Sequence, residues 1–563
     1  MENEVYERWL NHPDMDPVLK KELQSMTPQQ INDAFYTNLA FGTAGMRGLL
    51  GAGTNRMNIY TVRKANYGFG QYLCQLAEHP SVAIAYDNRF YSPQFAMESA
   101  RVLAGFGIKC YLFTSLRPTP ELSYAVRYLK CTGGIVVTAS HNPKEYNGYK
   151  VYDETGCQLT PEKIAKVIAN VQAVKDELAL QPRLTPEQEK LIVPIDRQVD
   201  IPYLKEVLTV QLNPQLTKDD FTIVFTPQHG TANCSVRALF DTIGYHYIPV
   251  AEQCVPDPAF SKTVVPNPED PRAYELAITY ARKNNADIVL STDPDADRVG
   301  VVVREANGHY SLMSGNQTGS VLLEYVFSQL QAKGKMPDNP VMFNTVVTSD
   351  LGERIAEHYG VATEKTLTGF KYIGAKIHGY ETSHARNFVF GYEESYGYLL
   401  KPFVRDKDAN QSCVIIAEAA NYYKQHGKTL MDVLHDLYAA YGTYSETQQS
   451  IALAGADGSA KLAKLLADLR AHVPSQLAGH VIVKYEDYGT RQRVVGGKAS
   501  PLEGFDVSDV LKYYMDDGSW IAIRPSGTEP KCKFYYCIKG RSADDAQMKT
   551  EEYYRAVKDL IGQ

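Results

Sequence analysis

Short runs of apolar, often β-branched residues alternate with longer amphipathic stretches through most of this chain. The runs have the length and composition of buried strands, and the clearest of them lie at residues 82–86, 109–113, 134–138, 221–225, 286–292, 340–344 and 387–390. The stretches between them, such as 58–78 and 92–106, have the length and amphipathic spacing of helices. This alternation predicts an α/β fold with largely parallel sheets, in which functional loops gather at the carboxyl ends of the strands.

The chain is too long for one hydrophobic core, because its 563 residues exceed the usual size of a single domain several times. A helical segment of about 40 residues precedes the first strand, and residues 181–200 are polar and rich in proline, as in a linker. A helical tract over about 411–439 closes the third unit. We expect three related α/β domains with mixed or parallel sheets and a smaller α+β domain, at residues 1–200, 201–313, 314–440 and 441–563.

The apolar run at 134–138 is followed by Ala-Ser-His-Asn-Pro, where the Asn-Pro step favours a tight turn. Ser140 is therefore presented at a strand end like a nucleophile, although an ordinary turn would fit the same residues. Asn147-Gly148 predicts a hairpin turn that brings Lys150 back beside this loop. Arg47, between the glycines of 42–48, is suited to reach a ligand.

Three carboxylates stand at alternate positions directly after the strand at 286–292. Asp293, Asp295 and Asp297 repel one another, and a hard divalent cation such as Mg²⁺ or Ca²⁺ would remove that repulsion. An EF-hand is excluded, because Arg298 and Arg304 stand where its glycine and its last carboxylate are required. A haloacid-dehalogenase-like phosphatase fits poorly, since Asp297 replaces the Thr or Val expected there.

Two later loops carry the chemistry of sugar and phosphate recognition. Glu393 and Ser395 lie between glycines, and their oxygens suit the hydroxyls of a sugar. The stretch 524–531 joins an arginine, two hydroxyls, a glycine amide and a lysine, which is the donor set that a phosphate dianion requires. No Walker-type phosphate loop is present, so a nucleotide donor is not indicated.

The bulk composition narrows the choice of partners. The net charge of -7 argues against nucleic acid and anionic membranes as ligands, and no apolar run is long enough to span a bilayer. Nine cysteines without a C-x-x-C pair fit neither a disulfide framework nor a zinc site, and the acidic N-terminus is not a signal peptide. We expect a cytoplasmic enzyme, monomeric or dimeric, that acts on a small phosphosugar.

Four loops, in this order, resemble those of the α-D-phosphohexomutase superfamily. The matching motifs are Thr-Ala-Ser-His-Asn-Pro at 138–143, Asp-x-Asp-x-Asp-Arg at 293–298, Glu-x-Ser at 393–395 and Arg-x-Ser-Gly-Thr-Glu-Pro at 524–530. The match spans nearly the whole chain. The stretch 391–397, followed by Arg-Asp-Lys-Asp at 405–408, resembles the longer branch, which contains bacterial α-phosphoglucomutases and eukaryotic phosphopentomutase-like enzymes.

The resemblance implies four domains around one cleft, with Ser140 carried as phosphoserine. That phosphate would complete a site for one Mg²⁺ with Asp293, Asp295 and Asp297. Transfer to a hexose monophosphate would give glucose 1,6-bisphosphate, which returns its other phosphate to Ser140, so that phosphate moves between O1 and O6 of glucose.

The resemblance also assigns residues to roles. General acid–base chemistry would fall to Lys150 and Lys371, helped by His141 and Arg47; some members have a histidine where Phe370 stands. The residues expected to bind substrate are Arg298, Thr368, Gly369, Glu393, Ser395, Arg524, Ser526, Gly527, Thr528 and Lys531.

Three alternatives remain open from the sequence. The same machinery could serve ribose or mannose phosphates, as in a phosphopentomutase or phosphomannomutase. A Mg²⁺-dependent sugar-phosphate phosphatase could use Asp293 as its nucleophile. A regulator could bind a phosphosugar without turning it over.

Overall fold

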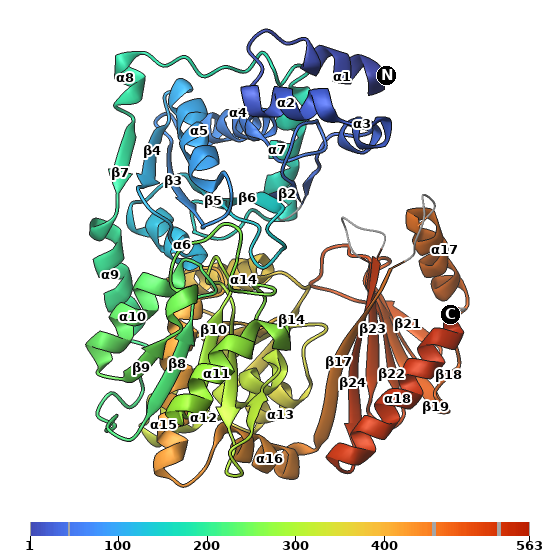
Figure 1. Ribbon diagram of the computed structural model, residues 1–563. Coiled ribbons are helices and arrows are strands. Elements are labelled where there is room, and N and C mark those ends of the chain that lie inside the picture. The colour runs from blue at the N-terminus through green and yellow to red at the C-terminus, as the bar shows by residue number, and fades with distance from the viewer. Residues whose placement is uncertain (1, 43–44, 453–457, 526–530, 562–563) are drawn as a thin grey trace. The chain divides into compact units, whose positions relative to one another are not determined.

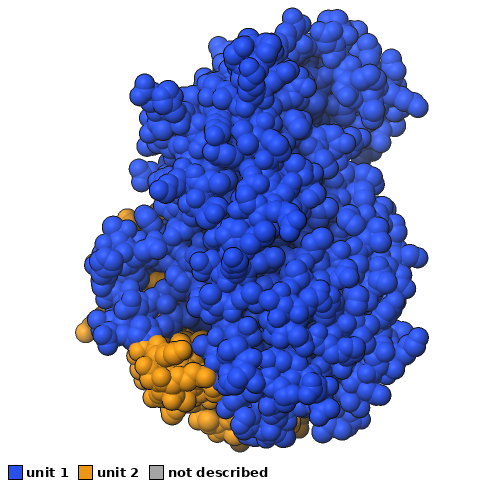
Figure 2. Space-filling view, turned by 90° about the vertical axis from the view of Figure 1, so that its left-hand side faces the viewer, with its two compact units in different colours: residues 1–318, 337–340, 370–429 blue, residues 319–336, 341–369, 430–563 orange. Residues whose placement is uncertain are grey.

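The computed structural model describes residues 2–42, 45–452, 458–525 and 531–561. The chain divides into two compact units, which are described separately. Unit 1 comprises residues 1–318, 337–340 and 370–429, and unit 2 comprises residues 319–336, 341–369 and 430–563 (Figure 2).

Unit 1 begins with three short helices, α1 (Glu2–Leu10), α2 (Pro17–Ser25) and α3 (Pro28–Phe35), as the sequence predicted. Asp16 and Thr27 cap α2 and α3 by accepting hydrogen bonds from backbone N–H groups of the first turn. The buried Trp9 packs edge-on against Phe35 and Tyr60, so these helices share a small core with the domain that follows.

The first sheet of unit 1 has seven strands with mixed directions (Figure 1). Their spatial order is β1 (Phe41–Gly42), β2 (Gly45–Leu49), β6 (Tyr146–Asp153), β5 (Gly133–Val137), β3 (Ser81–Tyr86), β4 (Lys109–Phe113) and β7 (Ile192–Ile195). The pairs β5–β3, β3–β4 and β4–β7 are parallel, and the pairs on the β6 side are antiparallel.

Helices cover both faces of this sheet. They are α4 (Ile59–Leu76), α5 (Ser92–Gly105), α6 (Thr119–Tyr128) and α7 (Pro161–Ala173). Successive residues of β5 point to opposite faces: a Cβ on Gly133 would meet Phe69 of α4, and one on Gly134 would meet Val126 of α6. The alternating glycines therefore let helices approach β5 from both sides.

Two local predictions for this domain are wrong. Residues 181–200 are not a linker, because they contain α8 (Pro186–Glu189), the edge strand β7 and the start of α9 (Arg197–Leu208); Pro194 is tolerated in β7 because that strand lies at the sheet edge. Asn147-Gly148 is not a turn but part of β6. A Cβ on Gly148 would come within 2.4 Å of the Thr138 carbonyl oxygen, so close backbone approach explains this glycine.

A second sheet in unit 1 carries the aspartate motif. Its strand order is β12 (Tyr310–Leu312), β11 (Val299–Arg304), β10 (Ile288–Thr292), β8 (Thr222–Thr226) and β9 (His246–Pro249). β10 is parallel to β8 and antiparallel to β11, so the aspartates occupy the turn between β10 and β11. The helices α10 (Ala232–Ile243) and α11 (Glu275–Asn284) belong to this domain.

The third domain contributes elements to both units. Its parallel pair is β13 (Pro340–Thr345) with β14 (Ala362–Thr366), and its antiparallel pair is β15 (Asn387–Glu393) with β16 (Gly397–Leu399). Its helices are α12 (Gly315–Ala332), α13 (Leu351–His358), α14 (Phe370–Ser383), α15 (Ala409–Gln425) and α16 (Leu430–Tyr441). The single helical tract expected over 411–439 is two helices, because Gly427 between them adopts a φ of +74°.

The C-terminal domain lies wholly in unit 2 and is built on an antiparallel sheet. Its main strands follow the order β17 (Thr443–Ala452), β24 (Lys531–Gly540), β23 (Trp520–Pro525), β22 (Leu511–Met515), β19 (His480–Asp487), β20 (Gln492–Val495) and β21 (Lys498–Pro501), with β18 (Gln476–Leu477) paired to β19. α17 (Gly458–Ala471) and α18 (Ala543–Leu560) cover one face (Figure 1). The predicted class, α/β domains followed by a smaller α+β domain, is confirmed.

None of the described helices combines the length and the apolar character that crossing a membrane would require.

Candidate active site

The loop between β5 and β6 presents the Ser140 side chain from a strained backbone. Ser140 has a φ of +52°, in the left-handed region that residues other than glycine rarely occupy. Its backbone N–H donates to Thr138 Oγ1 at 2.8 Å, and Asn142 N donates to the Ala139 carbonyl at 3.1 Å. These bonds tighten the turn and leave the Ser140 hydroxyl free to point away from its own strand.

Arg89 holds this loop from the end of the neighbouring strand β3. Its Nη1 donates to the carbonyl oxygens of Pro143 at 2.8 Å and Tyr146 at 3.1 Å. Its Nη2 donates to the carbonyl oxygens of Ser140, at 2.5 Å, and Asn142. A buried guanidinium thus binds three carbonyl oxygens of the loop and one at the start of β6, which fixes the conformation of the serine loop.

The turn between β10 and β11 brings Asp293 to this serine. Asp293 Oδ2 accepts a 2.6 Å hydrogen bond from Ser140 Oγ, although 153 residues separate the two. Its Oδ1 accepts from the backbone N–H groups of Asp297 at 3.1 Å and Arg298 at 3.0 Å. The carboxylate is therefore oriented by its own turn before it meets the serine.

Two buried lysines neutralise part of the charge of the three aspartates. Lys150 Nζ lies 2.7 Å from Asp295 Oδ2 and 3.4 Å from Asp297 Oδ2, and Lys407 Nζ lies 3.3 Å from the same Asp297 oxygen. Burial alone would raise the pKa of Asp297, but Lys407 and Lys150 lower it below its ordinary value. Burial and the neighbouring Asp295 raise the pKa of Asp293, which makes no ion pair with a lysine among the described residues.

The donor set fits a hard divalent cation. Carboxylate oxygens of Asp293, Asp295 and Asp297 lie within 4.8 Å of one another, and all three residues are buried. The Oδ1 atoms of Asp295 and Asp297 accept no hydrogen bond from any described residue. Buried carboxylate oxygens without a donor are costly unless a cation coordinates them, so this triad could hold a metal ion.

Sequence reasoning did not assign a role to Lys407, which the structure places at this site. Besides Asp297, its Nζ lies 3.1 Å from Asp406 Oδ1 and 3.9 Å from Glu393 Oε2. It thereby links the aspartate turn to a residue of the predicted sugar loop. The sequence shows only that Arg405 to Asp408 are four consecutive charged residues. The structure adds that all four are buried, and buried charges require partners.

The other site residues that the sequence predicts in unit 1 differ in whether they contact the serine loop and the aspartates. His141 Nδ1 is 3.2 Å from Ser140 Oγ, and Arg47 Nη1 donates to Asn142 Oδ1 at 2.8 Å. Arg298 pairs with Glu269 at 2.5 Å. Lys371 is buried in the first turn of α14, where its Nζ lies over the Tyr372 ring. Ser395 is half-buried in the turn between β15 and β16.

The remaining predicted residues belong to unit 2. Thr368 and Gly369 follow β14, and Gly369 has a φ of +117°. Arg524, near the end of β23, is half-buried and donates to Tyr535 Oη at 3.3 Å. Ser526, Gly527 and Thr528, together with the Lys531 side chain, lie outside the described residues, so their predicted phosphate contacts stay predictions.

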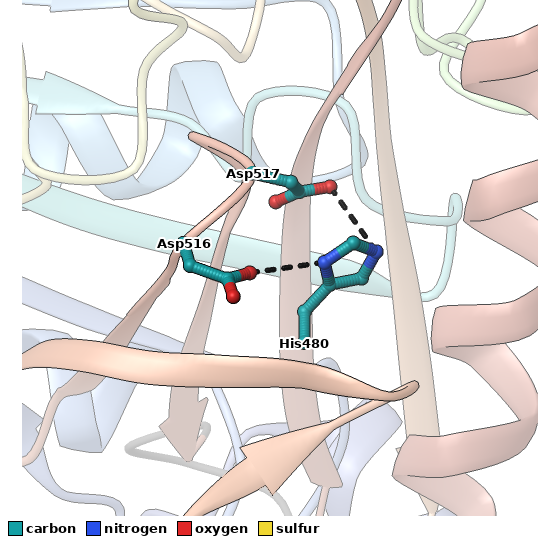
Figure 3. A group of neighbouring side chains, drawn as sticks. All are labelled: His480, Asp516 and Asp517. Carbon is teal, nitrogen blue, oxygen red and sulfur yellow. Dashed lines mark hydrogen bonds and ion pairs between the residues drawn. The ribbon is translucent and has the colours of Figure 1, made fainter.

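A second group of possible metal ligands occurs among the described residues, in the C-terminal domain (Figure 3). His480 Nδ1 lies 3.0 Å from Asp516 Oδ1, and its Nε2 lies 3.6 Å from Asp517 Oδ2. Lys549 Nζ, on α18, lies 3.0 Å from the same Asp517 oxygen. Because both ring nitrogens face carboxylates and an ammonium already binds one of them, we interpret this group as an ion-pair network.

Comparison with known proteins matches all four domains of the chain. Models of the phosphoglucomutase/phosphomannomutase family match as alpha/beta/alpha domain I over residues 38–177, domain II over 201–308, domain III over 314–441 and the C-terminal domain over 459–550. The chain belongs to this family. The predicted resemblance to the α-D-phosphohexomutase superfamily is confirmed, and the protein is a phosphohexomutase, an isomerase that transfers phosphate.

Relatives in this family match the chain over nearly its whole length. The phosphoglucomutase of Staphylococcus epidermidis strain ATCC 12228 is 39% identical over 539 residues, covering 94% of this chain and 96% of the relative. The phosphoglucomutase of Staphylococcus aureus strain MSSA476 is 37% identical over 546 residues, covering 96% of this chain and 97% of the relative.

Solved structures share the fold at lower sequence identity. The open form of parafusin, a phosphoglucomutase from Paramecium, has a TM-score of 0.68 at 17% identity and covers 94% of this chain and 96% of its own. A phosphoglucomutase/phosphomannomutase family protein from Burkholderia thailandensis has a TM-score of 0.67 at 18% identity and covers 92% of this chain and 97% of its own.

Replacing Lys407 with methionine is expected to lower kcat of this phosphohexomutase by roughly tenfold to a hundredfold. Asp297 must be ionised to bind a cation, and Lys407 favours the ionised form. Its removal raises the pKa of Asp297, so the acid limb of the pH–rate profile moves to higher pH. Lys424→Met, which removes an exposed lysine paired with Asp287, is the control. An unshifted acid limb in Lys407→Met would contradict this role.

Proposed function

We propose that the protein interconverts α-D-glucose 1-phosphate and glucose 6-phosphate, with Ser140 as the phosphate carrier. The observation that carries the proposal is the 2.6 Å contact between Ser140 Oγ and Asp293 at the buried aspartate triad. A serine hydroxyl beside a cation site suits phosphoryl transfer, which depends on positioning and charge neutralisation. Glucose is the preferred sugar because relatives 37–39% identical over nearly their whole length are named phosphoglucomutase.

In the proposed reaction, Ser140 carries a phosphate ester at rest. The free hydroxyl of the hexose monophosphate attacks this phosphorus and gives its proton to a protein base. The bond from phosphorus to Ser140 Oγ breaks, and Ser140 Oγ takes up a proton as it leaves. Glucose 1,6-bisphosphate, the intermediate, then turns over. Ser140 Oγ then attacks its other phosphate and gives its proton to a protein base. The bond from that phosphorus to the sugar oxygen breaks, the sugar oxygen takes up a proton, and the isomeric monophosphate leaves the restored phosphoserine.

Different residues of this chain would bind the cation and transfer protons in the proposed reaction. Asp293, Asp295 and Asp297 would hold one Mg²⁺, which supplies neutralisation of charge on the transferring phosphate. Burial alone would lower the pKa of Lys150, but Asp295 and Asp297 raise it above its ordinary value, so Lys150 is an ammonium that can donate a proton. His141, 3.2 Å from Ser140 Oγ, can exchange the serine proton.

The sugar and the second phosphate are assigned to other loops. We propose that Glu393 and Ser395 bind ring hydroxyls and that Lys371 assists in proton transfer. Arg298 and the residues of the 368 and 524 loops would complete substrate binding, namely Thr368, Gly369, Arg524, Ser526, Gly527, Thr528 and Lys531.

We also propose a reducing compartment, the cytoplasm, as the site of this reaction. All nine cysteines are free thiols, and Cys110, Cys413 and Cys537 are among those buried in the core. Free, unpaired cysteines in this number are typical of proteins that are kept reduced.

A coupled assay with glucose, mannose and ribose 1-phosphates tests the substrate. We expect kcat/KM for glucose 1-phosphate to exceed the other two by at least about tenfold, because the sugar loop must read ring hydroxyls by hydrogen bonds. A tenfold preference for ribose or mannose phosphate would assign the enzyme to phosphopentomutase or phosphomannomutase activity with the same transfer chemistry.

A further inference from the structure

Unit 2 contains a cavity of about 630 Å³ between the third-domain elements and the C-terminal sheet of that unit. Side chains of α13, β14, β19 and β22 line it. Five of them are basic, namely Arg354, Lys365, Lys484, Arg493 and Lys512, and aromatic rings of Tyr488, Phe505 and Tyr514 form part of its wall. Its volume falls in the range of cavities that hold a small metabolite.

The cavity lies on the sheet face that α17 and α18 leave uncovered. Leu511 and Tyr513 of β22 pack in the core beneath those helices. Lys512 and Tyr514 alternate with them and therefore point to the opposite face, toward the cavity.

Lys512 is a buried ammonium without a carboxylate partner. Its side chain is 1% exposed, and its Nζ donates to the Val346 carbonyl oxygen at 2.8 Å. The ring of Trp520 lies 3.7 Å from this nitrogen, and the ring of Tyr514 lies 4.8 Å from it. No described carboxylate forms an ion pair with it. Burial lowers the pKa of Lys512 to about 8, and the attraction of Asp350 offsets only part of this effect.

Of the four carboxylates that line the cavity, Glu353, Glu357 and Glu486 pair with basic groups other than Lys512. Glu353 Oε1 lies 2.5 Å from Lys365 Nζ. Glu486 accepts hydrogen bonds from Arg493 Nε at 2.8 Å and from the hydroxyl of Tyr514 at 2.9 Å. The fourth, Asp350, attracts Lys512 but forms no ion pair with it among the described residues, so no carboxylate binds this ammonium directly beside the open volume.

We propose that this cavity binds the oxyanion group of a small phosphorylated or carboxylated metabolite, with Lys512 as its main counter-ion. An anion there would stabilise the buried ammonium, which at present has one carbonyl and two rings as its contacts. Lys484, whose Nζ lies 3.4 Å from the centre of the Tyr514 ring, supplies a second cation at the cavity. The aromatic wall would pack against the body of the ligand. The site does not depend on the mutase reaction.

The position of the cavity distinguishes it from the predicted phosphate loop. Lys512 pairs across the sheet with Ala522, which lies two residues before Arg524. The two sites therefore share a sheet face, but Arg524 does not line the cavity. A ligand response that survives removal of Arg524 and is lost with Lys512 belongs to the cavity.

The two tryptophans of the chain provide a spectroscopic test that needs no enzyme activity. Trp520 contacts Lys512, whereas Trp9 lies in the N-terminal helix α1. The full chain, labelled with 5-fluorotryptophan, gives one fluorine NMR signal from each, assigned with Trp9→Phe. We expect inorganic phosphate or malonate, titrated separately to millimolar concentrations, to shift the Trp520 signal saturably and to leave the Trp9 signal in place.

The variants decide which site produces the shift. Lys512→Met is expected to weaken the response by at least about tenfold, since it removes a charge-assisted hydrogen bond, and Arg524→Ala is expected to keep it. Lys484→Met, at a half-exposed position, replaces Lys512→Met if the latter lowers the melting temperature.

Each outcome of the titration bears on the proposal. A shift with phosphate alone identifies phosphorylated ligands, and a shift with malonate alone identifies carboxylated ones. No saturable shift with either anion would overturn the proposal. A shift that is undiminished in Lys512→Met would also overturn it. The same holds for a shift that is lost in Arg524→Ala but present in Lys512→Met.

Discussion

Ser140→Ala is expected to lower mutase turnover by at least about three orders of magnitude, because the variant lacks the hydroxyl that carries the phosphate. Intact-mass measurement of the unaltered protein should show an adduct of about 80 Da, the mass of one phosphate, that maps to Ser140. The variant should lack this adduct. Ser140 is buried, but among the described residues its Oγ bonds only to Asp293 and the adjacent His141, so the melting temperature should change little.

The control for this variant is Ser115→Ala, which alters an exposed serine beyond the end of β4. It should keep full activity and the same mass adduct. Phosphate release that persists in Ser140→Ala would favour the phosphatase alternative, in which Asp293 is the nucleophile. A phosphosugar that binds the unaltered protein without any turnover would favour the regulator.

Asp293→Asn is expected to lower kcat by about a hundredfold to a thousandfold and to raise the Mg²⁺ concentration needed for half-maximal rate. The amide keeps the shape of the side chain, so the bonds from the backbone N–H groups of Asp297 and Arg298 can persist. What it removes is one of three negative charges that would hold the cation. Chelation of the unaltered protein should abolish activity, and added Mg²⁺ should restore it.

Asp287→Asn serves as the matched control, because Asp287 stands just before β10, at the end opposite the aspartate turn. It pairs with Lys424 at 2.7 Å and accepts from Thr222 N at 2.8 Å. Its loss should affect stability alone and leave the Mg²⁺ dependence unchanged. Full activity of the unaltered enzyme in excess chelator would contradict the metal assignment.

Features that depend only on neighbouring residues, such as strands, turns and charge repulsion, could be predicted from the sequence. The apolar runs before Ser140 and Asp293 are strands because β-branched residues suit a buried sheet, and both residues stand in the turns that follow. Repulsion among three alternate carboxylates likewise needs no fold to be recognised. The same local reasoning misread Gly148, because a glycine required by two neighbouring strands looks like a glycine required by a turn.

Partners that are distant in the chain could not be derived in this way. Nothing near Arg89 in the sequence indicates that it binds four carbonyls in and beside a loop some fifty residues away, and Lys407 stands in a charged run whose burial only packing reveals. Lys512 is a similar case, since a lysine in a strand is usually exposed. Its burial against Trp520 and Val346 follows from the contact between domains within unit 2.

The sequence by itself determined the strands, the loops at their ends and the chemical character of each loop, because hydrophobic periodicity and charge repulsion act between near neighbours. Tertiary structure alone decided that Ser140 lies 2.6 Å from Asp293, and which lysines neutralise the aspartates. Ser140 and Asp293 follow strands of separate sheets in different domains of unit 1, so the packing of those domains against one another sets the distances. The serine at the strand end thereby became one partner of a buried acidic centre.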